Sequence, residues 1–228
     1  MRIFFEDKHI LVVLKEAGIA VEDANIGRID LVSELKKHLG GGYLGVVHRL
    51  DMPVEGLLCF AKTKEAAAAL SKGLSDGGLN KSYHALVCGK VKKDSDTLVD
   101  YLSVRKLGPK GGKTAVISNE KDPDAKKAIL NYRVLGFEKV GDDFVTLLDI
   151  SIETGRFHQI RVQLSNMGNP IVADRKYGNE LSDKTASISG IRNVALFADR
   201  ISFIHPSTGE KMDFEYIPEN KFVKELIK

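Results

Sequence analysis

Hydrophobic and polar positions along this chain alternate in short runs that favour β-strands. Residues 3–13 predict two short strands around a polar turn, because the second half of this run is apolar and rich in β-branched side chains. A buried strand is also expected at 56–61, bounded by glycine and by a helix start. Further runs with strand character lie at 81–87, 128–135, 144–153, 194–204 and 212–216.

Two segments carry the signals of short helices. The segment 30–39 begins with Asp30, which can cap a helix, places three leucines on one face and is followed by Gly40. The segment 63–74 begins with Thr63, another capping residue, and continues through a run of four alanines. We therefore predict a helix in each segment.

Three further stretches are harder to interpret. The lysine-rich residues 106–127 contain several glycines and prolines, which predicts a mobile hairpin or surface loop. This stretch is either a solvated connection or a basic finger that touches a nucleic-acid backbone. Residues 158–167 have an apolar spacing that suits a short helix or a strand, and 178–192 are expected to be irregular.

The expected strands outnumber the expected helices and do not alternate strictly with them. This pattern indicates an α+β fold with a mixed, largely antiparallel β-sheet core flanked by helices and loops. With 228 residues, of which 43% are hydrophobic, the chain can bury a sizeable core. No internal repeat or linker is evident, so residues 1–228 are expected to form a single domain.

The composition narrows the class of protein. The net charge is +3 and the sequence pI is about 8.7, which is below the strongly basic range of many nucleic-acid modules. No apolar window is long enough for a membrane span and the N-terminus lacks a signal-peptide pattern, so a cytoplasmic protein is expected. Cys59 and Cys88 lie in apolar runs and are expected to be buried thiols, with no disulfide framework and no metal site.

Polar groups gather at three places beside apolar runs, at 48–51, 81–84 and 154–161. Together they offer one carboxylate, one phenol and several guanidinium groups. A carboxylate near an arginine stays ionised, so it is a poor proton donor but a usable nucleophile. Taken singly, these groups also fit a surface ion pair, core packing of a tyrosine and a solvated polar turn.

Taken in order, the same segments resemble the RluA-type RNA pseudouridine synthase family. Residues 47–51, followed by 56–58, resemble the family's motif around its catalytic aspartate. Residues 81–87 resemble the second motif, which supplies the active-site tyrosine, and 153–162 resemble the third. Similar segments also occur at 6–13, 168–174, 177–178 and 205–209. Departures, such as Lys15-Glu16 where the family usually shows Lys-Pro, leave the aspartate, tyrosine and arginine in place.

The resemblance implies isomerisation of uridine to pseudouridine within RNA, without a cofactor or metal. Asp51 is expected to be the essential carboxylate, attacking C1′ or the uracil ring, or assisting departure of the base. Arg161 is its expected ion-pair partner, with Arg156 as the alternative. Tyr83 is expected to pack on the target uracil and could transfer a proton.

The target uridine must be flipped out of its stem or stacked loop to reach a carboxylate. Arg49, two residues before Asp51, is a candidate wedge into the vacated space. His48, His158 and Gln159 are further candidates for contacts near the site. The substrate is expected to be ribosomal or transfer RNA, and the sequence leaves both open. We expect a monomer with no obligate protein partner, no membrane association and no separate N-terminal RNA-binding domain.

Two other functions remain open at this point. A non-catalytic RNA-binding protein on the same scaffold would keep its RNA affinity without Asp51. A hydrolase using Asp51 with His48 or His158 would act on a small substrate in a closed apolar pocket.

Overall fold

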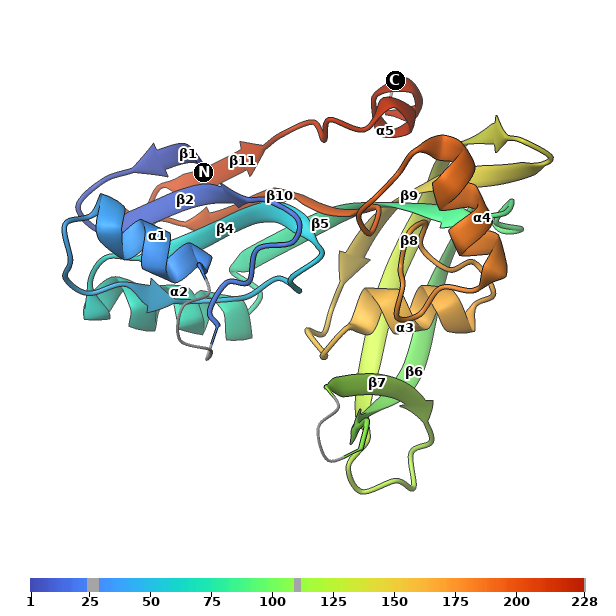
Figure 1. Ribbon diagram of the computed structural model, residues 1–228. Coiled ribbons are helices and arrows are strands. Elements are labelled where there is room, and N and C mark those ends of the chain that lie inside the picture. Colours follow the sequence, from blue (N-terminus) through green and yellow to red (C-terminus); the bar gives the residue numbers. More distant parts are fainter. Residues whose placement is uncertain (24–28, 109–111, 228) are drawn as a thin grey trace. The chain divides into compact units, whose positions relative to one another are not determined.

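The computed structural model describes residues 1–23, 29–108 and 112–227 of the chain (Figure 1). It forms two compact units, each assembled from two stretches of sequence. Unit 1 comprises Met1–Ser82 and Phe197–Pro218, and unit 2 comprises Tyr83–Leu196 and Glu219–Lys228. In the part of the chain that is described, strands dominate both units and most strand pairs are antiparallel. This arrangement confirms the predicted α+β class.

Unit 1 is built on a mixed sheet with the strand order β1-β2-β4-β10, in which β3 pairs with β4 and β11 with β10. The pairs are antiparallel except β4 with β10, where Ala198 lies opposite Gly56 in parallel register. The strands are β1 (Arg2–Glu6), β2 (Ile10–Lys15), β3 (Gly45–Val46), β4 (Glu55–Ala61), β10 (Leu196–Ile204) and β11 (Lys211–Glu215).

Helices α1 (Leu31–His38) and α2 (Lys64–Ser75) cover opposite faces of this sheet (Figure 1). The two faces follow from the alternation of side chains along β2 and β4. Even-numbered residues of β2, such as Val12, belong to the core cluster of α2, whereas odd-numbered residues, such as Val13, belong to that of α1. Both faces are therefore apolar, which explains why these strands appear as continuous hydrophobic runs.

Both predicted helix starts in unit 1 are confirmed. The Asp30 side chain accepts a hydrogen bond from the Ser33 backbone N–H at 2.7 Å. The Thr63 hydroxyl accepts one from the Ala66 N–H at 3.1 Å. These bonds satisfy backbone donors that the first turn of a helix otherwise leaves open.

In its described residues, unit 2 contains a sheet with the order β5-β9-β8-β6-β7 and three short helices. The pairs of β9 with β8, β8 with β6 and β6 with β7 are antiparallel. The chain enters this unit within β5, and β6 and β7 form a hairpin (Figure 1). The elements are β5 (Leu79–Cys88), β6 (Ser95–Lys106), β7 (Lys113–Ser118), β8 (Lys126–Val140), β9 (Asp143–Ile152), α3 (Gln159–Asn166), α4 (Glu180–Ser189) and α5 (Lys221–Leu226).

Helix α3 packs on the sheet of unit 2 through Val162, which shares a core cluster with Leu102, Ala115 and Ala128 from three strands. The segment 158–167 is therefore a helix, the first of the two structures that its spacing allowed. The hairpin of β6 and β7 likewise confirms the expectation of a hairpin in the lysine-rich stretch.

The prediction of irregular structure at 178–192 was wrong, because α4 occupies Glu180–Ser189. The Asn179 side chain caps this helix by accepting a hydrogen bond from the Ser182 N–H at 3.1 Å. The buried side chains of α4 are Ser182 and Thr185, which are polar, so the helix lacks the apolar periodicity that would have revealed it.

Both cysteines are free and fully buried, as predicted. Burial raises the pKa of the Cys59 thiol to about 12 and that of Cys88 to about 11. Both therefore stay protonated at neutral pH and act as apolar core residues. Among the described helices, none combines the length and the hydropathy required to cross a lipid bilayer.

Candidate active site: an aspartate turn and an arginine cluster

Asp51 lies in a tight turn that precedes β4 in unit 1. Its carbonyl oxygen accepts a hydrogen bond from the Val54 N–H at 3.0 Å, which closes the turn. The next carbonyl, that of Met52, accepts a bond from the Gly18 N–H at 2.8 Å. The backbone around the half-buried Asp51 side chain is therefore held from both sides.

The side chain of Lys15 also stabilises this turn. Its side chain is fully buried, and its ammonium donates to the carbonyl oxygens of Glu16, Ile19 and Met52 at 3.0, 2.8 and 3.0 Å. Burial lowers the pKa of Lys15 to about 8. The negative charges of Asp51 and Glu55 act in the opposite direction, because they favour the charged ammonium.

Lys15 was not predicted as part of the site, because a lysine at the end of an apolar strand ordinarily reaches solvent. The only sequence signal was that Lys15, shortly after the 6–13 segment, matches the lysine of the Lys-Pro pair that the family usually shows. The three carbonyl acceptors match the three N–H groups of an ammonium, so the geometry suits charged Lys15.

Gly56 fixes where β4 starts relative to β10. A Cβ atom at Gly56 would lie 2.5 Å from the Cβ of Ala198 and 2.6 Å from its carbonyl oxygen, which is too close for any side chain. Glu55, directly before it, accepts a hydrogen bond from the Tyr216 hydroxyl at 3.1 Å. The end of the Asp51 turn is thus anchored to the neighbouring strand.

His48 and Arg49 have different surroundings. His48 is 6% exposed and its Nε2 accepts a hydrogen bond from the Cys59 N–H at 3.2 Å. Burial, with the nearby charge of Lys81, lowers the pKa of His48 to about 3, so its imidazole is neutral. The Arg49 side chain is 70% exposed and forms an ion pair with Glu22 at 2.6 Å. Of the two, Arg49 has the accessibility that a wedge requires.

Arg161 in unit 2 is held by a buried carboxylate. Its Nε and one terminal nitrogen each donate to an oxygen of Asp174 at 2.8 Å, in a bidentate pair with side chains 5% and 1% exposed. Burial opposes ionisation of Asp174. The guanidinium and the backbone N–H groups of Lys176 and Tyr177 outweigh that effect and hold the Asp174 pKa below its ordinary value. The orientation of Arg161 is therefore fixed.

Tyr177 joins this arginine to His158 and to the β6–β7 hairpin. The Arg161 guanidinium lies 5.1 Å from the Tyr177 ring centroid. The Tyr177 hydroxyl lies 2.8 Å from Nδ1 of His158 and accepts a bond from the Ala115 N–H, also at 2.8 Å. The sequence places Tyr177 in the segment 177–178, which is similar to the family, but does not predict that it connects these groups.

Gln159 and Arg156 shape the turn that leads into α3. Gln159 is 3% exposed, and its Oε1 accepts bonds from the Thr154 hydroxyl at 2.8 Å and the Arg156 N–H at 3.0 Å. Its Nε2 donates to the Ile129 carbonyl at 3.0 Å. The Arg156 side chain is exposed and its Nε donates to the Lys127 carbonyl at 3.0 Å. Gln159 therefore ties the turn to β8.

The predicted site residues are distributed over both units. His48, Arg49 and Asp51 belong to unit 1. Tyr83 belongs to unit 2, where it lies in β5 and is 5% exposed. The rest of the predicted set in unit 2 comprises Arg156, His158, Gln159 and Arg161. Within unit 2 the structure brings His158 and Arg161 together through Tyr177.

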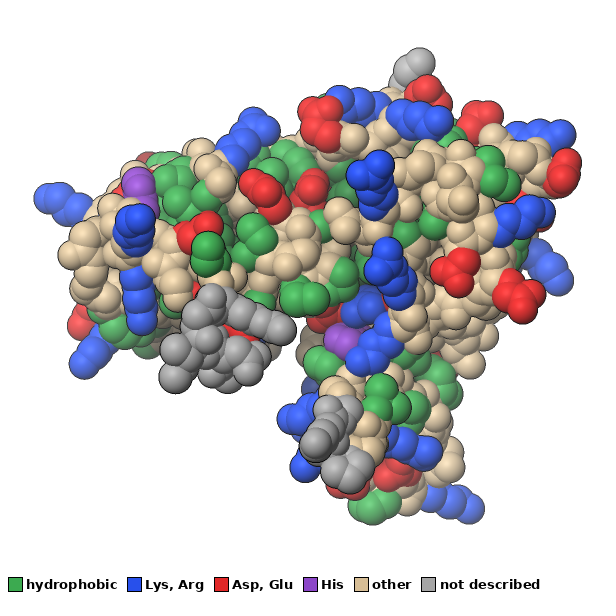
Figure 2. Space-filling model, in the orientation of Figure 1, with side chains coloured by type: hydrophobic (Ala, Val, Ile, Leu, Met, Phe, Trp, Pro, Cys, Tyr) green, Lys and Arg blue, Asp and Glu red, His purple; other side chains and the backbone are tan. Residues whose placement is uncertain are grey.

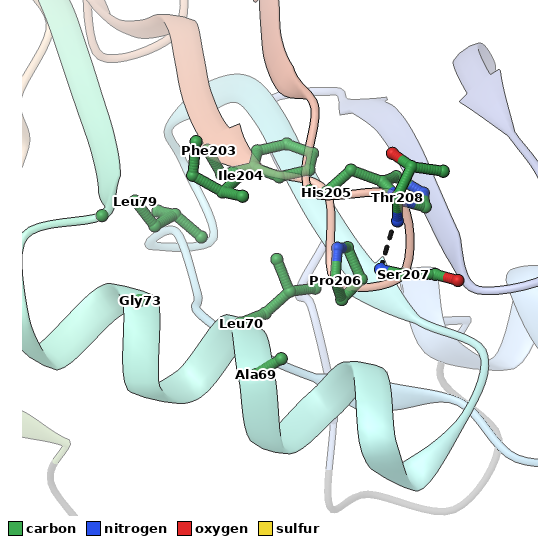
Figure 3. Close-up of a pocket in the computed structure, with 12 residues that line it drawn as sticks. Ala69, Leu70, Gly73, Leu79, Phe203, Ile204, His205, Pro206, Ser207 and Thr208 are labelled. Carbon is green, nitrogen blue, oxygen red and sulfur yellow. Dashed lines mark hydrogen bonds between the residues drawn. The ribbon is translucent and has the colours of Figure 1, made fainter.

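A pocket of about 450 Å³ opens in unit 1 between α2 and the turn that joins β10 to β11 (Figure 3). It contains none of the predicted site residues. His205, its one ionisable lining residue, faces Asp7 at 3.1 Å and accepts backbone N–H groups of Ser207 and Thr208 on its other nitrogen. The remaining lining residues are Ala69, Leu70, Gly73, Gly78, Leu79, Phe203, Ile204, Pro206 and Gly209.

Comparison with known proteins identifies relatives over most of the chain. The family model described as RNA pseudouridylate synthase matches residues 9–166. Ribosomal large subunit pseudouridine synthase D of Zymomonas mobilis is 34% identical over 94% of this chain and 68% of its own length. Ribosomal large subunit pseudouridine synthase C of Escherichia coli K12 is 33% identical over 93% of this chain and 65% of its own length. The chain thus spans about two thirds of these relatives.

Solved structures show the same fold. Human RNA Pseudouridylate Synthase Domain Containing 1 aligns with a TM-score of 0.78 at 23% identity, covering 96% of this chain and 83% of the other. Human RNA Pseudouridylate Synthase Domain Containing 4 aligns with a TM-score of 0.75 at 22% identity, covering 99% and 91%.

Proposed function

Because this chain belongs to the RNA pseudouridylate synthase family, we propose that it isomerises specific uridines in structured RNA to pseudouridine, with Asp51 as the reacting carboxylate. The observation that carries this proposal is the Asp51 turn. Lys15 and Gly18 hold its backbone, so the Cα atom that carries the carboxylate has a fixed position before β4. The curated relatives are named for the ribosomal large subunit, which favours ribosomal over transfer RNA as the substrate.

The proposed reaction is balanced without a further reactant. The N1–C1′ glycosidic bond breaks, the uracil rotates, and a C5–C1′ bond forms. The proton leaves C5 and a proton is taken up at N1, so neither an oxidant nor an energy source is required. Asp51 serves as the nucleophile toward C1′ or the uracil ring, or assists departure of the base. Tyr83 is the candidate for packing on the uracil and for moving the C5 proton.

Arg161 and Arg49 are assigned supporting roles in this proposal. Arg161 stabilises the ionised carboxylate of Asp51, as the family motif implies, and Asp174 fixes its guanidinium. Arg49 enters the space that the flipped uridine leaves, a role supported by its exposed side chain. His48 and Gln159 are buried, so we assign them to the support of their turns.

The test is a map of pseudouridines in cellular RNA from a strain that lacks the protein. We expect a discrete site to disappear and to return only with the wild-type gene. In purified form, Asp51→Asn should lower turnover on that RNA by at least about 1000-fold, the scale seen when other enzymes lose a nucleophile. Asp213→Asn is the control, because Asp213 is an exposed carboxylate of the same unit.

An unchanged map, together with wild-type protein that leaves ribosomal and transfer RNA unmodified, would overturn the proposal. If such protein bound RNA equally well with Asp51→Asn, the non-catalytic RNA-binding alternative would take its place.

A further inference from the structure

Phe157 presents an aromatic ring at the surface of unit 2. Its side chain is 41% exposed. The ring stacks on that of His158, with the centroids 3.7 Å apart and the planes inclined by 22°. An exposed ring is by itself ordinary, but this one forms a stacked pair with a second ring and so offers a broad flat face to a ligand.

The aromatic pair sits on a rigid base. The Thr154 hydroxyl accepts the Ile129 N–H at 2.9 Å, and Gln159 returns a bond to the Ile129 carbonyl at 3.0 Å. His158 adopts a left-handed backbone conformation with φ 53°, and its Nδ1 lies 2.8 Å from the Tyr177 hydroxyl. The protein around this pair is already ordered, so stacking of a ligand on it would cost little conformational entropy of the protein.

Exposed cationic residues lie on the elements that hydrogen bonds link to the aromatic pair. The Arg156 side chain beside Phe157 reaches the carbonyl of Lys127 on β8. The Lys176 side chain donates to the carbonyl of Lys113 on β7, next to the residues that Tyr177 contacts. Figure 2 shows several Lys and Arg side chains on the visible face of unit 2.

An aromatic platform flanked by cations matches the chemistry of single-stranded RNA. Unpaired bases stack on aromatic rings without regard to sequence, and the cations hold the phosphates on either side. An apolar protein partner fits this site less well. It would bury several cations without offering them partners, which is unfavourable because the charges would lose their water.

We propose that Phe157, supported by His158, is a stacking platform for an unpaired base of the RNA substrate. Arg156, Lys127, Lys113 and Lys176 contact the adjoining phosphates. This inference rests on the proposed function and names a part of its RNA substrate that must be unpaired. It also makes Phe157 a determinant of substrate choice, outside the residues that react.

The test compares RNA binding by Phe157→Ala and wild type, each in the Asp51→Asn background so that no turnover occurs. The probes are a fluorescein-labelled single-stranded RNA of about 12 nucleotides, within the usual site size, and a duplex of the same length. We expect Phe157→Ala to weaken binding of the single strand by about 5-fold to 100-fold. Binding of the duplex should change by less than about 2-fold, because paired bases cannot stack on the ring.

Three variants control this measurement. Phe157→Trp should retain the affinity, since it keeps a flat ring. Phe157→Leu should lose it as Phe157→Ala does, although it keeps most of the apolar volume and should melt within about 2 °C of wild type. Phe137→Ala removes a ring that is 51% exposed elsewhere in unit 2 and should leave both affinities unchanged.

The salt dependence of binding distinguishes the contribution of base stacking on the ring from that of the phosphate contacts. Lys127→Ala should reduce the slope of log affinity against log salt by about 0.7, whereas Phe157→Ala should leave the slope unchanged. Equal binding of the single strand by Phe157→Ala and wild type would overturn the platform. If turnover of the mapped uridine nevertheless required Asp51, the proposed function would stand without the platform.

Discussion

Asp51 in unit 1 and Arg161 in unit 2 are both held in place by charged side chains, but the two arrangements respond differently to change. The Asp51 turn depends on a buried ammonium that faces three neutral carbonyl oxygens. Arg161 depends on a bidentate contact with the full charge of Asp174. The first arrangement contains a group that can lose its proton near neutral pH. The second consists of groups that keep their charges throughout the neutral range.

Asp174→Ala should give the largest effect on stability. It removes the bidentate partner of a guanidinium that is 5% exposed, and loss of one member of a buried ion pair typically costs about 3 to 5 kcal/mol. Urea unfolding of the purified chain measures the difference. The pKa of Asp174 is lowered in the folded chain, so its contribution is complete above pH 4 or so and falls only as the pH drops further.

Asp149→Ala is the matched control for Asp174, because Asp149 pairs with Arg133 in the same unit with both side chains partly exposed. Its cost should stay at about 1 kcal/mol or less. Similar losses for the two variants would show that Asp174 does not anchor Arg161 as described.

Lys15→Met should give an intermediate effect. The change leaves the carbonyls of Glu16, Ile19 and Met52 without the ammonium and should cost about 2 kcal/mol of unfolding free energy. Because the Asp51 turn loosens, kcat should fall by about 10-fold while the affinity for RNA stays within about 2-fold. Single-turnover kinetics and equilibrium binding separate the two quantities.

Lys62→Met removes a lysine of unit 1 that bonds Glu6 and the Asp7 carbonyl, outside the Asp51 turn. Its kcat should match that of wild type. An equal fall in kcat for both lysine variants would remove Lys15 from the support of Asp51.

The pH dependence should show the smallest effect on turnover, and stability and turnover should change in opposite directions. The pKa of Lys15 is about 8 in the folded chain and about 10.4 when unfolded, so between these values the unfolded chain binds more protons. The contribution of Lys15 to unfolding free energy should therefore rise with pH across this window. Turnover should fall several-fold above pH 8, because a neutral amine offers two N–H groups to three carbonyls. Lys15→Met should lack this component of both profiles.

Local signals in the sequence were enough to predict elements whose chemistry is local. Asp30 and Thr63 cap helices because the capping bond needs only residues three positions apart. The strands around the Asp51 turn were visible because both of their faces are apolar. The family motifs pointed to the residues of both clusters, although their roles in the reaction remain predictions.

The features that were missed depend on contacts across the fold. Strand β6 carries mixed polar and apolar residues, so its pattern did not distinguish it from a loop. Helix α4 buries Ser182 and Thr185 and shows no apolar face. Lys15 is buried only because three carbonyls from two separate stretches converge on it, and Tyr177 connects residues that are 62 and 19 positions away. No local pattern records such convergence.

The parallel pairing of β4 with β10 has a consequence for how the chain is made. Gly56 pairs with Ala198, which is synthesised about 140 residues later. The end of the Asp51 turn therefore cannot be anchored until Ala198 has been made. At ribosomal speeds of about 5 to 20 residues per second, that interval is roughly 10 to 30 seconds. Throughout it, the start of β4 lacks its pairing with β10, and an unpaired stretch of apolar strand can pair with other nascent chains. Unit 1 therefore cannot reach its complete strand pairing until its second stretch, Phe197–Pro218, has been synthesised, although most of its residues leave the ribosome first.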